Sequence, residues 1–309
     1  MRRVIIPKTG PGTPGPLLLT RSPRGRMLLM ARQPDGTIGC WDVASGEELW
    51  RVTDDSISFS LTVVRLPQGR TLLASGGEDG VCRWDALTGE PLPGNLCPDR
   101  TIWSVASGTV HDGRSILVGA GHDHLVYRWD AMTGEPLGTP LSGHGFCVKS
   151  VEVITLPDGS TMIASGGEDA AVRRWEAISG APFGAPLNGH EGQVLSLASV
   201  TLADGRILLA SADSDGVIRR WDAITGEPIG RPIHTGAWAF QFAVIIAAEG
   251  PCLLAAGGDR LIRRIDLLTG ALIGDPIPGV GVAAARALDG STMIATSAYC
   301  GDITVQPLH

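Results

Sequence analysis

The sequence predicts an all-β fold, a seven-bladed β-propeller made of four-stranded antiparallel blades. Two observations predict this fold. A Trp-Asp pair or a variant of it recurs at steps of 43, 45, 46, 46 and 44 residues, and a fixed period of this size is typical of repeat architectures. Each repeat also holds four short β-type segments separated by glycine-rich turns, which is the pattern of one propeller blade. We therefore expect residues 1–309 to form a single propeller domain.

The repeat at residues 143–187 shows the four strands most clearly. Its first segment alternates in polarity and is rich in β-branched side chains, which predicts a strand. The turn signal Asp158-Gly159 then separates the first strand from the second. In order along this repeat, the predicted strands are residues 148–154, 161–165, 171–175 and 181–187.

Counting the third strands gives seven blades, although the last two lack tryptophan. Residues 289–295 repeat residues 158–164 residue for residue, so Gln306 falls where Trp175 stands in its own repeat. The following residues end the third strands and number the blades one to seven: Trp41, Trp84, Trp129, Trp175, Trp221, Ile265 and Gln306.

The two ends of the chain predict how the ring closes. The seventh repeat stops at its third strand, residues 303–305, whereas residues 3–6 form a strand that belongs to no repeat. We expect this N-terminal strand to become the outermost strand of blade seven. Such closure removes free sheet edges, which otherwise invite aggregation.

Charge and hydropathy argue against two classes of partner. The formal net charge is −7, whereas proteins that bind nucleic acid need a basic footprint. No apolar run approaches the roughly 20 residues that cross a membrane, and the N-terminus lacks the apolar core of a signal peptide. We expect a soluble, cytoplasmic protein that binds neither nucleic acid nor membrane.

Cysteine and arginine usage adds two further expectations. The 6 cysteines are dispersed without a CxxC pair, so neither a zinc site nor a disulfide framework is indicated. Only Lys8 and Lys149 are lysines, and the other basic residues are arginines. A GC-rich bacterial genome and thermal adaptation both account for this bias, and the sequence leaves the two open.

The repeated residues resemble the WD-repeat family of β-propellers, and we expect a bacterial type with seven repeats along the whole chain. The resemblance lies in a Gly-His pair followed by Ser, then Asp, then Trp-Asp. In that family, a buried tetrad of His, Ser or Thr, Asp and Trp can hold a blade together. The resemblance implies complete tetrads in blades four and five: His144, Ser165, Asp169, Trp175, His190, Ser211, Asp215 and Trp221.

Other blades depart from the tetrad. Blade two has Asp54 at the histidine position, and its acid-to-tryptophan spacing is one residue short, which would turn Trp84 to the opposite face unless the turn absorbs the slip. Blade six retains only His234 and Asp259. We expect blades four and five to be the most rigid part of the ring.

No group of residues predicts catalysis or a cofactor. The Ser-His-Asp sets in blades four and five recur at the tetrad spacing without a GxSxG nucleophile elbow, so we interpret them as structural. The run His122-Asp123-His124 offers two imidazoles but no third metal ligand nearby, and a solvated rim histidine fits it better. We therefore assign no catalytic, cofactor-binding or metal-binding residue.

The rim of the channel is the better candidate for function. In the family, residues that start the first strands and precede the blade aspartate line the narrower face. Aromatic groups beside acidic ones suit a partner with basic residues, although Phe59 and Trp103 could equally fill gaps in the core. Trp238 stands as far from its anchor as Val148 does, so we assign it to the core. The candidate partner-binding residues are Phe59, Glu78, Thr101, Trp103, His122, Phe146, Lys149, Glu168, Gln193 and Tyr299.

These observations favour a non-catalytic, monomeric scaffold that presents its rim and channel mouth to a protein or peptide. A propeller that binds a small molecule or catalyses a reaction at the channel mouth is the alternative, because the fold hosts many functions. A regulatory module of a larger signalling assembly is a third possibility.

Overall fold

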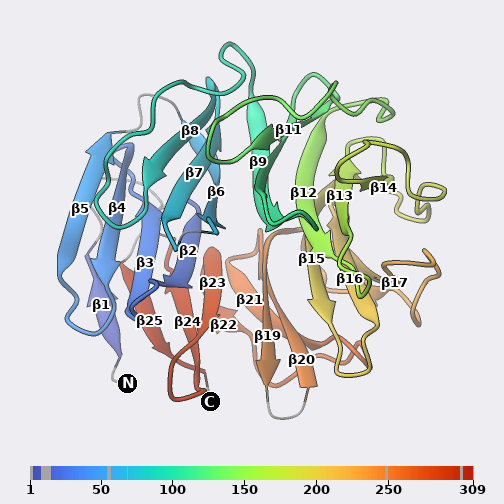
Figure 1. Cartoon of the computed structure of the whole chain (residues 1–309). Coiled ribbons are helices and arrows are strands. Elements are labelled where there is room, and N and C mark those ends of the chain that lie inside the picture. The colour runs from blue at the N-terminus through green and yellow to red at the C-terminus, as the bar shows by residue number, and fades with distance from the viewer. Residues whose placement is uncertain are drawn as a thin grey trace.

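Seven antiparallel sheets form a ring in the described part of the chain (Figure 1). The structure is a computed structural model, and it describes residues 3–7, 15–53, 57–67, 69–247, 250–299 and 302–308. Within these residues, no helix is long and apolar enough to cross a membrane. The all-β propeller that the repeat period predicts is confirmed.

Each sheet is one blade, and its first strand faces the centre of the ring. Blade one holds β2 (Leu17–Arg21), β3 (Met27–Arg32), β4 (Thr37–Asp42) and β5 (Glu48–Thr53). Blade two holds β6 (Ser58–Arg65), β7 (Thr71–Gly77) and β8 (Gly80–Asp85). Blade three holds β9 (Ile102–Thr109), β10 (Ser115–Gly121) and β11 (Val126–Asp130), and blade four holds β12 (Val148–Thr155), β13 (Thr161–Gly167) and β14 (Val172–Glu176).

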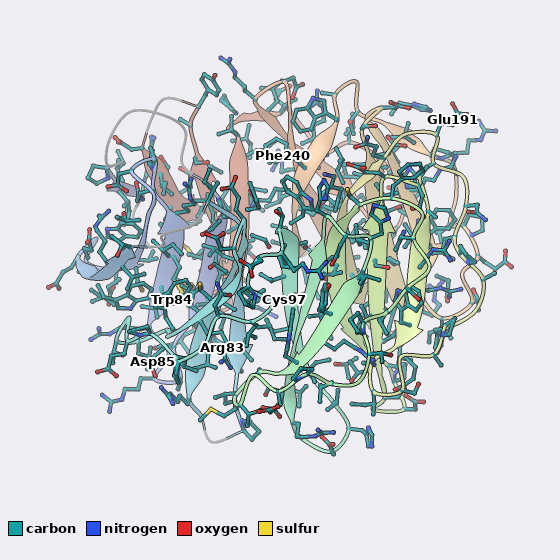
Figure 2. The ribbon with its side chains drawn as sticks, turned by 90° about the horizontal axis from the view of Figure 1, so that it is seen from above. Arg83, Trp84, Asp85, Cys97, Glu191 and Phe240 are labelled. Carbon is teal, nitrogen blue, oxygen red and sulfur yellow. The ribbon has the colours of Figure 1, made fainter. Side chains whose placement is uncertain are left out.

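The remaining blades continue in the same order around the ring, and Figure 2 shows Trp84 of blade two and Phe240 of blade six on separate blades. Blade five holds β15 (Val194–Thr201), β16 (Ile207–Asp213), β17 (Val217–Asp222) and β18 (Ile233–His234). Blade six holds β19 (Ala239–Ala247), β20 (Gly250–Gly257), β21 (Leu261–Asp266) and β22 (Ile277–Pro278). Blade seven holds β23 (Gly281–Arg286), β24 (Thr292–Ser297), β25 (Ile303–Pro307) and β1 (Val4–Ile6).

The N-terminal strand closes the ring as predicted. β1 pairs antiparallel with β25, with Val4 opposite Val305 and Ile6 opposite Ile303. Ile6 is 0% exposed and packs in a cluster that joins blades seven and one. The first and last segments of the chain therefore share one sheet.

The fourth strand is reduced in blades two, three and four. In blade four, only Trp175–Pro182 and Val172–Leu187 form bridges across this edge. Proline has no N–H to donate to a ladder, which keeps this edge short. The predicted outer strand is thus present as two contacts with a turn between them.

The hydrophobic core lies between blades. Each of seven clusters of buried apolar side chains in the described chain joins two neighbouring blades. Trp175 of blade four, for example, packs with Ile116 and Val118 of blade three. A blade buries its apolar faces only against its neighbours, so the ring is stable as a whole.

The short spacing in blade two is absorbed by a tighter turn. Gly77 pairs directly with Gly80, and Leu73 lies opposite Trp84 as Ile163 lies opposite Trp175 in blade four. Trp84 therefore keeps its buried face and is 5% exposed. Asp54, at the histidine position of this blade, lies outside the described residues.

Buried arginines link successive blades. Arg128 donates through Nη1 to the carbonyls of Ala177 and Ile178 in the next blade, at 2.9 Å each. In blade one, Trp50 takes this role and donates to Ala86 O at 3.2 Å. The arginines that make such bonds to the following blade are Arg83, Arg128, Arg174 and Arg220.

Candidate binding site at the channel mouth

The buried tetrad of blade four forms a chain of hydrogen bonds. His144 Nδ1 donates to Asp169 at 2.9 Å, and His144 Nε2 accepts from the Ser165 hydroxyl at 2.8 Å. The indole N–H of Trp175 donates to Ser165 Oγ at 2.9 Å. Each of these polar groups is costly to bury without a partner. The chain of bonds therefore fixes the second and third strands to the loop before the first.

Blade five builds the same chain with a different acid, which corrects the assignment of Asp215. His190 Nδ1 donates to Asp213 Oδ2 at 2.6 Å, and Asp213 is 1% exposed. Asp213 occupies the register position that Gly167 holds in blade four, opposite the start of the first strand. A carboxylate at that position reaches the imidazole directly, so Asp215 remains exposed.

Burial makes the two Ser-His-Asp sets unsuitable as nucleophile systems. Ser165 and Ser211 are both 0% exposed, and each hydroxyl also accepts from an indole N–H. Burial lowers the pKa of His144 and of His190 below the usual range, although their carboxylate partners oppose this. A substrate cannot reach either hydroxyl while the blade is folded.

Blade six does not retain its predicted tetrad pair. His234 lies exposed on β18, opposite Val217, at the edge of blade five. Asp259 instead accepts from Arg263 Nη1 at 3.1 Å. The interpretation of His234 and Asp259 as remnants of a tetrad was therefore wrong.

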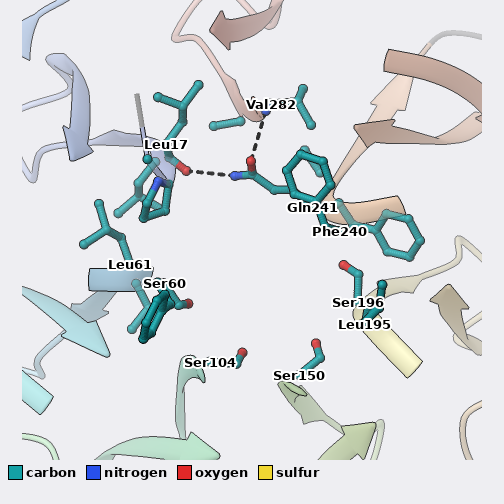
Figure 3. Close-up of a pocket in the computed structure, with 18 of the residues that line it drawn as sticks. Leu17, Ser60, Leu61, Ser104, Ser150, Leu195, Ser196, Phe240, Gln241 and Val282 are labelled. Carbon is teal, nitrogen blue, oxygen red and sulfur yellow. Dashed lines mark hydrogen bonds between the residues drawn. The ribbon is translucent and has the colours of Figure 1, made fainter. Parts of the chain in front are cut away.

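The seven first strands enclose a central cavity of about 920 Å³. Polar side chains of the first strands accept hydrogen bonds from the backbone of the next blade. Ser150 Oγ accepts the N–H of Leu197 at 3.0 Å, and Gln241 Oε1 accepts the N–H of Val282 at 3.3 Å. Figure 3 looks into this cavity and shows residues from all seven blades around it, including Leu17, Ser60, Ser104, Ser150, Ser196, Gln241 and Val282.

On one side of the mouth, Trp103 is held between an aromatic ring and an ammonium group. Its ring centroid lies 4.5 Å from that of Phe59. Lys149 Nζ lies 4.0 Å from the Trp103 ring centroid and 3.0 Å from Glu168 Oε1. Burial raises the pKa of Glu168, but the hydrogen bond and charge of Lys149 outweigh it, so the net pKa is lowered. Phe59 and Trp103 are half-buried and line the cavity.

On the other side of the mouth, further aromatic side chains are exposed to solvent. Trp238 is 46% exposed and Phe240 is 37% exposed, with ring centroids 5.2 Å apart. Arg260 lies over the ring of Tyr299 at 3.6 Å. The pair Trp238 and Phe240 and the pair Arg260 and Tyr299 both line the cavity. In the part of the chain that the structure describes, no carboxylate is paired with Arg260.

Trp238 is therefore a mouth residue, and its assignment to the core was wrong. Ala239 pairs with Gly257 as Val148 pairs with Gly167. The first and second strands of blade six are one residue closer in sequence than those of blade four. This moves Trp238 out of the buried position and onto the rim.

The structure brings some of the predicted rim residues together and leaves others apart. Glu168 joins the group through Lys149. His122 donates its backbone N–H to Thr101 O at 3.0 Å beside the mouth. Glu78, Thr101, His122, Phe146 and Gln193 do not line the cavity, whereas Phe59, Trp103, Lys149 and Tyr299 do. The sequence reasoning missed Arg32, Phe240 and Arg260, although Trp238 and Phe240 at the start of a predicted strand were a usable signal.

One acidic side chain lies inside the cavity. Glu152 accepts from the Ser199 hydroxyl at 2.8 Å, in the neighbouring blade. Burial raises the pKa of Glu152 to about 7, and the hydrogen bonds from Ser199 partly oppose this rise. Glu152 is thus a channel-lining carboxyl that changes charge near neutral pH. No group of three metal-ligating side chains occurs in the described residues.

Two segments, residues 134–176 and 183–222, match the family described as WD domain, G-beta repeat. They contain the complete tetrads of blades four and five.

The chain is also similar to the structure of U3-55K, with a TM-score of 0.78 and 16% identity over 99% of this chain and 98% of that one. The chain is likewise similar to the crystal structure of the RRP9 WD40 repeats, with a TM-score of 0.78 and 15% identity over 99% of this chain and 97% of that one. At these identities the likeness shows the fold alone. No curated protein gives a significant match.

Proposed function

We propose that this propeller is a non-catalytic scaffold that holds a peptide segment of a partner protein at the channel mouth. The observation that carries the proposal is the cluster of aromatic side chains there: Phe59, Trp103, Trp238, Phe240 and Tyr299. Exposed, clustered aromatic groups are the usual anchors of protein interfaces. Two of them, Trp238 and Tyr299, are nearly half exposed, at 46% and 47%.

The orphaned donor of Trp103 adds support. Its indole N–H is buried without an acceptor in the described residues, and such a group costs free energy until it is paired. A peptide carbonyl that reaches the N–H edge of the indole would satisfy it. Rigid aromatic groups also lose little conformational entropy on binding.

The charged side chains at the mouth bear on the charge of the partner. A basic partner was predicted from Glu78 and Glu168, but Glu168 is engaged with Lys149. The cavity lining also carries Arg32 and Arg260. These cations disfavour a basic segment, and the basic character of the partner stays a prediction.

Selection of displayed random peptides against the immobilised full-length protein tests the proposal. We expect the selected peptides to lose at least about tenfold in affinity for Trp103→Ala or Trp238→Ala, since each removes an aromatic anchor worth about 2 kcal/mol. Met132→Ala is the matched control, because Met132 is 47% exposed but does not line the cavity. Peptides that bind all three variants as tightly as the wild type would contradict the mouth as the site.

A small molecule in the channel is the second candidate, because of Glu152. A cavity of about 920 Å³ lies within the usual range for ligand pockets, and a buried carboxyl with a raised pKa is a typical feature of such sites. A thermal-shift screen would detect it. Stabilisation by a compound that vanishes in Glu152→Gln supports this candidate, and stabilisation that persists in Glu152→Gln argues against it.

A further inference from the structure

The face opposite the mouth carries an uneven distribution of charge. On this face the hairpin turns connect the first and second strands of each blade. The last residue of the first strand before each turn is Arg in three consecutive blades, Thr in three others and Ala in blade six. In the order of blades seven, one, two, three, four, five and six, these residues are Arg286, Arg21, Arg65, Thr109, Thr155, Thr201 and Ala247.

In blades one and two, the turn next to this arginine has also lost an acid, since Arg24 and Gln68 stand where blade seven keeps Asp289. In blades three and five, the turn aspartate accepts the N–H two residues on, as Asp112 does from Arg114 at 3.0 Å and Asp204 from Arg206 at 3.1 Å. Arg24 stands at that position in blade one, where Ser22 Oγ accepts the N–H of Arg26 at 3.1 Å instead. A negative charge in the repeat is thus replaced by a positive one.

Arg21 and Arg65 line a cleft of about 660 Å³ between blades one and two, whereas Arg286 of blade seven lies outside it. Within the described chain, no carboxylate lines it. Most of its other large side chains are apolar, with Ser22 and Thr71 beside them, and Leu288 of blade seven is 74% exposed at its edge. The cleft is lined by Arg21, Arg24, Arg65 and Arg70 with Pro23, Leu66, Pro67 and Leu288, among others.

Three of the four guanidinium groups are left without an ion pair. Arg70 donates to Asp85 at 2.8 Å. Among the described residues, Arg21, Arg24 and Arg65 have no carboxylate within ion-pair distance. In blade five, Arg206 stands at the position of Arg70 and, like it, is paired with a carboxylate, Asp204 at 2.8 Å. Unpaired like charges repel each other, so an anion in this cleft relieves that repulsion.

We propose that this cleft binds a short acidic segment of a protein, in a second site separate from the channel mouth. The guanidinium group matches a carboxylate in a bidentate geometry, so several arginines around one cleft select a run of Asp or Glu side chains. The proline and leucine walls suit the aliphatic parts of a peptide. A nucleic acid fits less well, because the chain as a whole carries a net charge of −7 and repels a long polyanion.

The test is titration of a fluorescein-labelled octaglutamate peptide into the full-length protein. Arg21→Thr and Arg65→Thr install the residue that blades three to five carry at the same register position, so the fold already accommodates them. We expect each variant to weaken peptide binding by about tenfold, which corresponds to one lost charge-assisted contact. The affinity should also fall steeply with added salt.

Arg206→Thr is the matched control, since it removes one arginine from the same face outside the cleft. It should bind octaglutamate within about twofold of the wild type, as should Trp238→Ala at the mouth. Thermal melting of every variant confirms that it is folded, and Arg24→Ser replaces any variant that is not. The proposal is overturned if the wild type does not bind octaglutamate, if Arg206→Thr weakens binding as much as Arg65→Thr, or if a twelve-residue oligothymidylate binds more tightly.

Discussion

At the scale of single residues, the two tetrads show how one missing side chain decides which acid is used. A Cβ added at Gly167 would lie 2.8 Å from His144 Nδ1, so glycine leaves room for Asp169 to reach the ring. In blade five, Asp213 stands at that position and bonds to His190 itself. Both arrangements satisfy a buried imidazole, from different positions along the turn.

This difference predicts unequal costs for two neighbouring aspartates. Asp213→Ala leaves His190 Nδ1 buried without its acceptor, which should cost about 2 kcal/mol of unfolding free energy. Asp215→Ala removes an exposed side chain and should cost less than about 0.5 kcal/mol. Urea unfolding followed by tryptophan fluorescence measures both variants. Equal losses would show that the histidine does not depend on Asp213.

At the scale of elements, the arginine before the tryptophan of blades two to five joins one blade to the next. The third strand turns Trp175 into the core and Arg174 toward the following blade, because neighbouring side chains of a strand point to opposite faces. A Cβ at Gly226 would lie 2.6 Å from Arg174 Nη2, so the glycine of the next turn makes room for the arginine. The repeated Arg-Trp and Thr-Gly pairs therefore belong to one contact between blades.

Replacing one of these arginines should loosen the ring. Arg128 is 4% exposed, and Arg128→Met keeps most of its volume but leaves the carbonyls of Ala177 and Ile178 without their donor. We expect a loss of about 2–3 kcal/mol in unfolding free energy. Arg206→Met, on an exposed arginine, should change it by less than about 0.5 kcal/mol. Guanidinium chloride denaturation compares the two, and similar midpoints would refute a stabilising role for Arg128.

At the scale of the whole molecule, stability depends on closing the ring between the two ends of the chain. Every blade buries its apolar faces against two neighbours, and β1 supplies the outer strand of blade seven. Without β1, the edge of β25 would expose unpaired backbone groups, and such edges recruit strands from other molecules.

Two adjacent isoleucines of β1 test this closure. Ile6→Ala should cost about 2–4 kcal/mol, because Ile6 is 0% exposed and its loss leaves a cavity in the cluster between blades seven and one. Ile5→Ala, at a side chain that is 54% exposed, should cost less than about 1 kcal/mol. Thermal unfolding measures both. Removal of residues 1–6 should also produce oligomers on size-exclusion chromatography, and an unchanged monodisperse peak would contradict closure by β1.

The sequence by itself determined the number of blades, the first three strands of each and the closing strand, because these follow from a local period and from alternation within each strand. Only the tertiary structure decided the sites. The first hairpin of blade six is one residue shorter than that of blade four, which places Trp238 at the mouth and not in the core. In blade five, His190 bonds to Asp213 and not to Asp215. The mouth and the arginine cleft join side chains from blades far apart in sequence. Which of these side chains meet depends on how each strand is registered in the closed ring, and a one-residue shift in register reverses the face that a side chain occupies.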